Sequence, residues 1–337
     1  MMSDIGQRRV LWLTPDKPEN ISVGRQRIAD ELSLCGFNVT VRGTNLRTGT
    51  RSLRERGEYD AIIGTTRAGA VAATVVGKLG GVPVVVDHVD PIRQLYETQS
   101  RWLPWLVERL ENVSFRLAAQ VLYVYDEEEE RIRQLTDAYS QTDLGVDYDR
   151  FSNPDESARR TASDHLETLD LDENISIYVG GLEEVYNVRP LLEAMDHLPN
   201  WSLLIVGTGS LEPVVEQYAT GRDDIEYIGV VPHETIPGYL HQADVGVSLV
   251  DDPHTLKILE YLAASVPAVQ LDGRARARFG DHVTYCSLDP SDIAHAIHTA
   301  GENSVSDATH DFVRRVSWST IAEQYESVLR RVITETA

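Results

Sequence analysis

The stretch DVGVSLVDDPHTLKILEYLAASVPAVQLD (residues 244–272) contains two short apolar runs with a helical pattern between them. The runs at 244–250 and 266–272 have the length and the valine content of strands. The helix between them is expected to begin near Thr255, just after Pro253. A strand, a helix and a second strand in this order indicate a parallel sheet with crossover helices.

The same alternation recurs in two series, which are separated by a polar stretch at 151–171. It predicts an α/β fold of two Rossmann-like, doubly wound domains that face each other across a cleft. We expect an N-terminal domain at 1–150, a linker at 151–171 and a C-terminal domain at 172–317. The expected strands are 9–14, 38–43, 59–65, 82–88 and 119–125 in the first domain, and 175–181, 201–209, 225–230, 244–250 and 266–272 in the second.

The chain is strongly acidic, with a formal net charge of −22, which argues against nucleic-acid binding. Only three of its 31 basic residues are lysines, Lys17, Lys78 and Lys257. This balance favours a halophilic protein, because concentrated salt screens the self-repulsion of so many carboxylates. An ordinary acidic protein would not explain the missing lysines.

Cys35 and Cys286 fit no metal or redox spacing, so we expect two buried thiols in a reducing cytoplasm. The N-terminal run RRVLWLTP (8–15) has strand length and does not resemble a signal peptide. No run of residues approaches the ~20 apolar residues that cross a bilayer. The expected location is therefore cytoplasmic.

The helix that follows Pro253 begins with a pattern suited to a nucleotide sugar. Free amides at its start, at Thr255 and Leu256, can cradle a phosphate group. Lys257 in the first turn is unfavourable against the helix dipole unless an anion binds there. Glu260, three residues on, lies on the same face and could accept ribose hydroxyls. The alternative is an exposed Lys–Glu pair of little consequence.

Here the chain resembles the retaining GT-B glycosyltransferases of family four. Asp252 and Glu260 have the spacing of that family's two acids, and KILEYLAASVPAV (257–269) is similar to the helix that follows. The resemblance implies that Glu260 binds the donor ribose and that Asp252 lies near the donor sugar. Aspartate at 252 and Ser265 are departures from the commoner glutamate and glycine.

The segment YVGGLEEVYNVRPLLEAM (178–195) resembles the first strand, loop and helix of the family's C-terminal domain. Gly181 and Tyr186 stand where the family has an arginine and a lysine that grip the donor diphosphate. Lys257, Arg189, the helix amides and Arg25 could compensate for the two missing cations. The competing interpretation is a degenerate scaffold that binds a sugar nucleotide or a partner protein without turnover.

Two further segments of the second domain resemble the family. Residues 203–219 contain Gly207-Thr208-Gly209 after a strand, which alone is weak evidence for a dinucleotide site. Residues 225–250 match the segment in which the backbone, here at Val230 and Val231, contacts the nucleobase.

In the first domain, residues 20–41 look like the family's glycine loop and first helix, with Gly24 close to a ligand. A simple turn glycine is equally compatible. His88 ends an expected strand, where family members place a histidine near the donor sugar and the acceptor. A structural histidine is the alternative.

Residues 100–120 form an amphipathic pattern with Trp102 and Trp105, and the matching region of related enzymes often rests on membrane. Packing of this face against its own sheet is the alternative. Residues 312–333 resemble the family's closing helix, which crosses back to the first domain. The first domain is therefore expected to include 318–337.

The function predicted is that of a retaining, metal-independent hexosyltransferase. It would move a sugar from a nucleotide-diphosphate donor to a lipid-linked or growing glycan acceptor, without any other cofactor. His88, Asp252 and Glu260 are the candidate catalytic residues. The Asp170-Leu171-Asp172 sequence has the form of a metal site, but we interpret it as part of the solvated linker. An epimerase or hydrolase on the same fold lacks a supporting set of residues.

Overall fold

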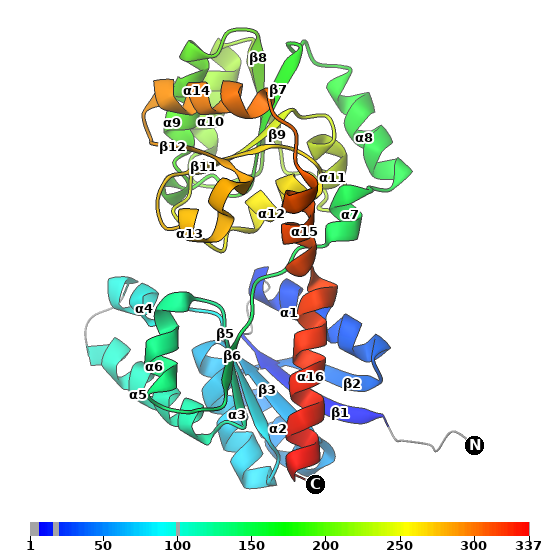
Figure 1. Cartoon of the computed structure of the whole chain (residues 1–337), viewed down its shortest axis with the longest axis vertical. Helices are drawn as coiled ribbons and strands as arrows, with labels where there is room; N and C mark the ends of the chain where they lie inside the picture. The colour runs from blue at the N-terminus through cyan, green and yellow to red at the C-terminus, as the bar shows by residue number, and fades with distance from the viewer. Residues whose placement is uncertain (1–6, 16–19, 99–101, 337) are drawn as a thin grey trace. The chain divides into compact units, whose positions relative to one another are not determined.

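The computed structural model describes residues 7–15, 20–98 and 102–336 (Figure 1). The chain forms two compact units. Unit 1 comprises Met1–Gly145 together with Trp318–Ala337, and unit 2 comprises Val146–Ser317. Each unit has one six-stranded parallel sheet with its own hydrophobic core, so the predicted α/β class of two doubly wound domains is confirmed.

The sheet of unit 1 has the strand order β2-β1-β3-β4-β5-β6. Its direction of winding reverses between β1 and β3, which makes their carboxyl ends a topological switch point. The strands are β1 (Arg8–Thr14), β2 (Phe37–Gly43), β3 (Ala61–Thr65), β4 (Val84–His88), β5 (Gln120–Tyr123) and β6 (Tyr139–Gln141). The helices are α1 (Asn20–Leu34), α2 (Leu46–Arg54), α3 (Thr66–Gly80), α4 (Ile92–Thr98), α5 (Trp102–Leu117), α6 (Glu129–Arg133) and α16 (Trp318–Thr336).

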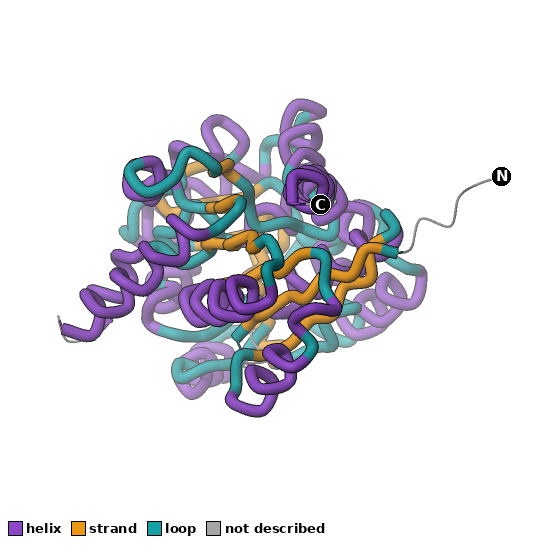
Figure 2. Tube along the Cα trace, turned by 90° about the horizontal axis from the view of Figure 1, so that it is seen from below, coloured by secondary structure: helices purple, strands orange, loops and turns teal. Residues whose placement is uncertain are grey.

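Both faces of this sheet are covered by helices, as Figure 2 shows for the strands seen from below. Val10, Leu11, Trp12 and Leu13 are therefore all buried along β1, as in other parallel sheets. The closing helix α16 packs on one face through a stripe that includes Tyr325, whose ring stacks on Trp12 at 5.4 Å. Helix α16 therefore belongs to unit 1, although it lies at the far end of the chain from the other elements of that unit.

The sheet of unit 2 has the order β12-β11-β10-β7-β8-β9. The strands are β7 (Asn174–Val179), β8 (Trp201–Val206), β9 (Ile225–Gly229), β10 (Val245–Ser248), β11 (Ala268–Leu271) and β12 (Thr284–Cys286). The helices are α7 (Tyr148–Ser152), α8 (Glu156–Leu166), α9 (Val188–Ala194), α10 (Glu212–Gly221), α11 (Ile236–Leu240), α12 (Leu256–Ala263), α13 (Arg276–Phe279), α14 (Pro290–Gly301) and α15 (Asp307–Arg315). The winding reverses between β7 and β10, so the switch point lies at their carboxyl ends.

The stretch 151–171 differs from the predicted linker, because most of it forms helices of unit 2. Ala158, Ala162 and Leu166 recur at helical spacing along α8 and are buried. A Cβ at Gly238 would lie 2.2 Å from the carbonyl oxygen of Ala158, so α11 and α8 are in close contact. The boundary between the units falls at Gly145 and Val146 instead.

The edge strands β6 and β12 were not predicted. Each has three residues, and neither lies in an apolar run. Cys286 is buried as expected, whereas Cys35 is partly exposed. Among the described residues, no helix is long and apolar enough to span a bilayer.

Candidate functional site

The candidate site of unit 2 lies at the carboxyl ends of β7, β8 and β10, where loops with glycines meet. Gly180 follows β7 and Gly207 follows β8, both with positive φ angles of 150° and 145°. A Cβ at Gly207 would lie 1.8 Å from the carbonyl oxygen of Gly180, so only glycine fits there. The amide of Gly180 donates to the carbonyl of Val206 at 2.9 Å. The two loops are therefore held directly against each other.

This packing explains the Gly207-Thr208-Gly209 sequence. A Cβ at Gly209 would lie 2.5 Å from the carbonyl oxygen of Leu182, and the amide of Leu182 donates to the carbonyl of Thr208 at 3.0 Å. These glycines allow contact between two backbone segments, which gives them a structural reason independent of any dinucleotide.

Hydrogen bonds fix both ends of the loop between β7 and α9. The hydroxyl and the amide of Ser210 both donate to the carboxylate of Glu183, the amide at 3.0 Å, and this bonding lowers the pKa of Glu183. Asn187 has φ 52°, a conformation that asparagine tolerates, and its side-chain amide donates to the carbonyl of Leu249 at 2.7 Å. The loop is thereby bound both to the β8 loop and to the end of β10.

Helix α12 begins beside this loop. Thr255 is its N-cap and is buried, and the amide of His254 donates to the carboxylate of Asp252 at 2.9 Å. Asp252 therefore shapes the turn that leads into the helix. Thr255 makes no side-chain cap, so the first amides of α12, including that of Leu256, are open to an acceptor.

Lys257 lies in the first turn of α12 and reaches the β7 loop. A Cβ at Gly180 would lie 2.2 Å from Cε of Lys257, so the side chain runs along this glycine. Its Nζ atom is 4.2 Å from the ring centroid of Tyr186 and 5.7 Å from that of Tyr178. Burial lowers the pKa of Lys257, against the opposing effect of the Glu260 and Asp252 carboxylates. The ammonium is thus an incompletely compensated cation at the switch point.

Glu260 lies one turn further along α12 and is mostly buried. Burial raises its pKa to about 7, and the nearby charges of Lys257 and Arg150 only partly oppose this effect. Few water molecules reach a carboxyl group that is buried in this way. Hydrogen-bond donors of a ligand, such as vicinal hydroxyls, would therefore stabilise it.

The other residues predicted in unit 2 lie around this centre. Gly181 follows Gly180 directly, and a Cβ there would lie 2.9 Å from Cε2 of Tyr186. Val230, just after β9, is 71% exposed, and Val231 packs partly against the core. Arg189 is exposed and pairs with Glu184 at 3.2 Å, so its charge is already compensated.

In unit 1, Arg25 is committed to a buried ion pair, which differs from the predicted donor contact. Its Nε and Nη2 atoms donate to Asp87 at 2.6 and 3.0 Å. Thr65 and Tyr325 donate to the same carboxylate at 2.6 and 2.7 Å. Arg25 is 1% exposed. It joins α1, β3, β4 and α16 and is not part of the site described above.

His88 is likewise structural in this conformation. Its Nδ1 and Nε2 atoms lie 3.2 and 3.0 Å from the carboxylates of Glu111 and Glu128, and Arg131 binds both acids. Burial favours the neutral ring, but the two carboxylates outweigh it and raise the pKa of His88 to about 9. Nε2 has a hydrogen bond to Glu128 and Nδ1 faces the carboxylate of Glu111, so neither nitrogen faces open space for the predicted contact with a sugar.

Gly24 lies within α1 instead of in a loop. A Cβ there would lie 2.7 Å from the ring of Trp318, and one at Gly145 would lie 2.4 Å from the same ring. The two glycines make room for Trp318 at the start of α16. This packing supplies the reason for glycine at position 24 without a ligand.

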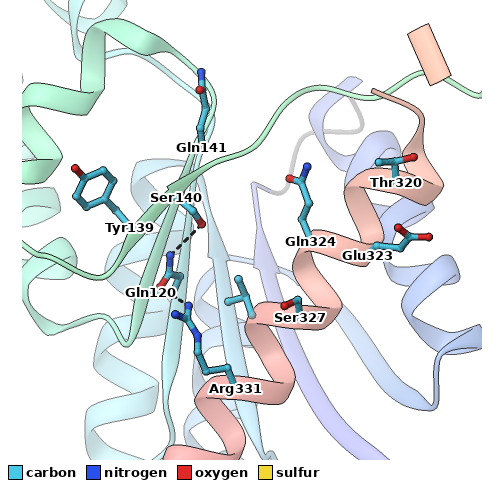
Figure 3. Close-up of a pocket in the computed structure, with 10 residues that line it drawn as sticks. Gln120, Tyr139, Ser140, Gln141, Thr320, Glu323, Gln324, Ser327 and Arg331 are labelled. Carbon is cyan, nitrogen blue, oxygen red and sulfur yellow. Dashed lines mark hydrogen bonds between the residues drawn. The ribbon is translucent and has the colours of Figure 1, made fainter. Parts of the chain in front are cut away.

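A groove of about 570 Å³ lies in unit 1 between β6 and α16. Figure 3 shows Gln120, on β5, between Ser140 and Arg331, with which it forms hydrogen bonds of 3.0 and 2.7 Å. Most residues that line it carry polar side chains, and no predicted site residue belongs to it. Among the described residues, no group of three or more His, Cys, Asp or Glu side chains is placed to hold a metal ion.

Comparisons with known proteins find matches for most of unit 2 and for the whole fold. Residues 173–303, which lie within unit 2, match the family model described as Glycosyl transferases group 1. The whole fold is that of GT-B glycosyltransferases. Sucrose-phosphate synthase from Thermosynechococcus elongatus superposes with a TM-score of 0.76, at 16% identity, over 97% of this chain and 100% of that one.

The Anabaena protein Alr3699/HepE, crystallised with UDP and glucose, superposes with a TM-score of 0.73 at 16% identity, over 96% of this chain and 100% of that one. A glycosyltransferase from Rickettsia africae gives 0.74 at 12% identity, over 97% and 99%. No curated protein sequence matches the chain.

Sequence reasoning missed three contributors to the site. Tyr178 looks like an ordinary strand residue, and Gly180 and Asn187 look like ordinary turn residues. Asparagine in a short loop before a helix is a weak signal for the left-handed conformation. Nothing in the sequence signals that the Tyr178 ring faces a lysine 79 positions away.

Proposed function

We propose that this protein is a glycosyltransferase that transfers a sugar from a nucleotide-diphosphate donor to a hydroxyl group of an acceptor, with retention of configuration and without a metal ion. The observation that carries the proposal is the pair of Lys257 and Glu260 at the switch point of a domain that matches the glycosyltransferase family. Ligands of open parallel sheets bind at such points.

Each residue of the site has a role in this proposal. Lys257 and the first amides of α12, beginning with that of Leu256, would stabilise the charge that develops on the leaving diphosphate. The amide predicted at Thr255 already donates to the carbonyl of Asp252 at 3.3 Å. Glu260 would accept hydrogen bonds from the ribose, and Asp252 would lie near the transferred sugar. The backbone at Val230 and Val231 would contact the nucleobase.

The acceptor proposed is a lipid-linked or growing glycan, reached from the cytoplasmic side. Helix α5 supports contact with a membrane, because its apolar stripe is exposed instead of packing on the sheet. Trp102 is 69% and Trp105 54% exposed, and the guanidinium of Arg109 lies 5.3 Å from the Trp105 ring. Amphipathic helices with exposed tryptophan and nearby arginine lie in bilayer interfaces. We further infer from the scarcity of lysine that the protein works in concentrated salt.

The test is a binding and turnover assay with UDP-, GDP- and dTDP-sugars at low and high salt. We expect donor hydrolysis or transfer, with donor affinity reduced about tenfold or more by Lys257→Met, which removes a charged contact, or by Glu260→Gln, which turns one acceptor oxygen into a donor. Lys78→Met and Glu216→Gln change exposed residues outside the site and serve as matched controls. Tight binding with no turnover would refute the transferase and leave the scaffold. Equal affinity in all four variants would refute the site.

A further inference from the structure

We propose that Tyr186 is a positioning residue whose ring, together with that of Tyr178, holds the Lys257 ammonium against Gly180. The inference rests on the proposed function for its consequence, because the ammonium is then presented to a diphosphate. The contact itself is a property of the ligand-free protein.

Two aromatic rings lie beside the ammonium, which also runs against Gly180. Nζ of Lys257 lies 4.2 Å from the Tyr186 centroid, well within the range of a cation–π interaction, and 5.7 Å from the Tyr178 centroid. Within the described part of the chain, this ammonium has no hydrogen bond or ion pair with another residue. The two ring faces therefore add to the attraction that the Glu260 and Asp252 carboxylates exert on this ammonium from beyond ion-pair distance.

Both rings are fixed by their surroundings. Tyr178 is 1% exposed, and its hydroxyl donates to the carbonyl of Gly181 at 2.6 Å. Tyr186 lies in the loop that Glu183 and Asn187 tie to the neighbouring strand ends. Because both rings are already fixed in the ligand-free protein, their contact with Lys257 costs little conformational entropy of the rings.

Gly181 and Tyr186 depend on each other. A Cβ at position 181 would lie 2.9 Å from Cε2 of Tyr186, so the absence of a side chain at 181 leaves room for the ring. A long side chain at 181 would displace Tyr186 from Lys257. Gly181 and Tyr186 stand where the related family has an arginine and a lysine. Together they position Lys257, the cation of α12.

The test uses the full-length protein labelled with ¹³C at the lysine ε-carbon. The chain has three lysines, so the Lys257 resonance is identified by its loss in Lys257→Arg. Position 186 is changed in an isosteric series, Tyr186→Phe, Tyr186→4-fluorophenylalanine and Tyr186→3,4,5-trifluorophenylalanine. Fluorine withdraws density from the ring face and leaves the ring volume nearly unchanged.

We expect the acid dissociation constant of the Lys257 ammonium to rise stepwise with fluorine, by roughly 2- to 30-fold over the series, the range that corresponds to a cation–π contact. The same series at Tyr218, a half-buried tyrosine on α10, should leave it unchanged. A constant that does not vary with fluorination at 186 would overturn the proposal.

A second measurement separates this inference from the proposed function. UDP, GDP and dTDP are titrated into the labelled protein. We expect one of them to shift the Lys257 resonance, with a dissociation constant that rises about three- to tenfold in Tyr186→Leu and is restored in Tyr186→Phe. If the fluorine dependence holds while no nucleotide shifts Lys257, the proposed function fails and the positioning role stands. If a nucleotide binds equally well in all variants, the positioning role fails.

Discussion

The buried carboxylate of Asp87 allows the sharpest prediction, which concerns Asp87→Asn. Each oxygen of Asp87 accepts two hydrogen bonds, one from Arg25 and one from a hydroxyl, either Thr65 or Tyr325. Asparagine turns one oxygen into a donor. Whichever way the amide is oriented, its NH₂ group then faces an N–H of Arg25, and the guanidinium is left buried without a counter-ion.

We expect Asp87→Asn to lower the free energy of unfolding by about 3–5 kcal/mol, the usual cost of removing one partner of a buried ion pair. The double variant with Arg25→Met should cost less than the sum of the single changes, with a coupling of roughly 1–3 kcal/mol. Urea unfolding followed by tryptophan fluorescence reports mainly on unit 1, which contains Trp12, Trp102, Trp105 and Trp318.

The control is Glu130→Gln, which breaks the exposed pair with Arg133 and should change stability by less than about 0.5 kcal/mol. If Asp87→Asn costs no more than this control, the guanidinium of Arg25 is solvated. The reasoning would then be refuted, and Arg25 would return as a candidate for ligand binding.

Two further predictions concern unit 1. The pKa of His88 is raised to about 9 in the folded state, so its stabilising charge is fully present below pH 6.5 and is lost as the pH rises through 9. The unfolding free energy should therefore fall by about 3 kcal/mol between these pH values. His88→Gln should remove most of that slope and leave the smaller part that comes from Glu260, whose pKa burial raises to about 7. His298→Gln, at an exposed position, should preserve the slope. A slope that keeps its full size in His88→Gln contradicts the assignment. Separately, Trp102→Ser with Trp105→Ser should reduce co-flotation with anionic liposomes at least fivefold, because the bilayer contact depends on burial of these rings. Leu34→Ser, at an exposed apolar position outside α5, is the control, and equal flotation of all variants would argue against the membrane contact.

Much of the candidate site in unit 2 could be predicted from local sequence. The helix that begins after Thr255 places Lys257 and Glu260 on one face, because a helix repeats every 3.6 residues. The order of strands and helices fixed that face at the carboxyl edge of a parallel sheet. The rings beside Lys257 come from strand β7 and from the loop that follows it. Their contact with Lys257 depends on how the loops after β7, β8 and β10 pack against one another.

Unit 1 shows where local reasoning fails. Three residues of unit 1 have the types and positions of ligand-binding groups: Gly24, Arg25 and His88. Each of them already contacts a partner that is distant in sequence. Gly24 accommodates Trp318, Arg25 pairs with Asp87, and His88 lies between Glu111 and Glu128. A sequence pattern gives the chemistry of a side chain and does not show whether a partner already satisfies it.

Periodicity and composition predict the α/β class, most of the strands and the lysine and glutamate of α12, because these signals act over a few neighbouring residues. The helices that most of 151–171 forms in unit 2, the burial of Arg25 and His88 in ion-paired networks, and the room that Gly181 leaves for Tyr186 beside Lys257 became visible only in the folded chain. These outcomes depend on contacts between residues far apart in the chain, where burial and charge compensation decide which groups stay available.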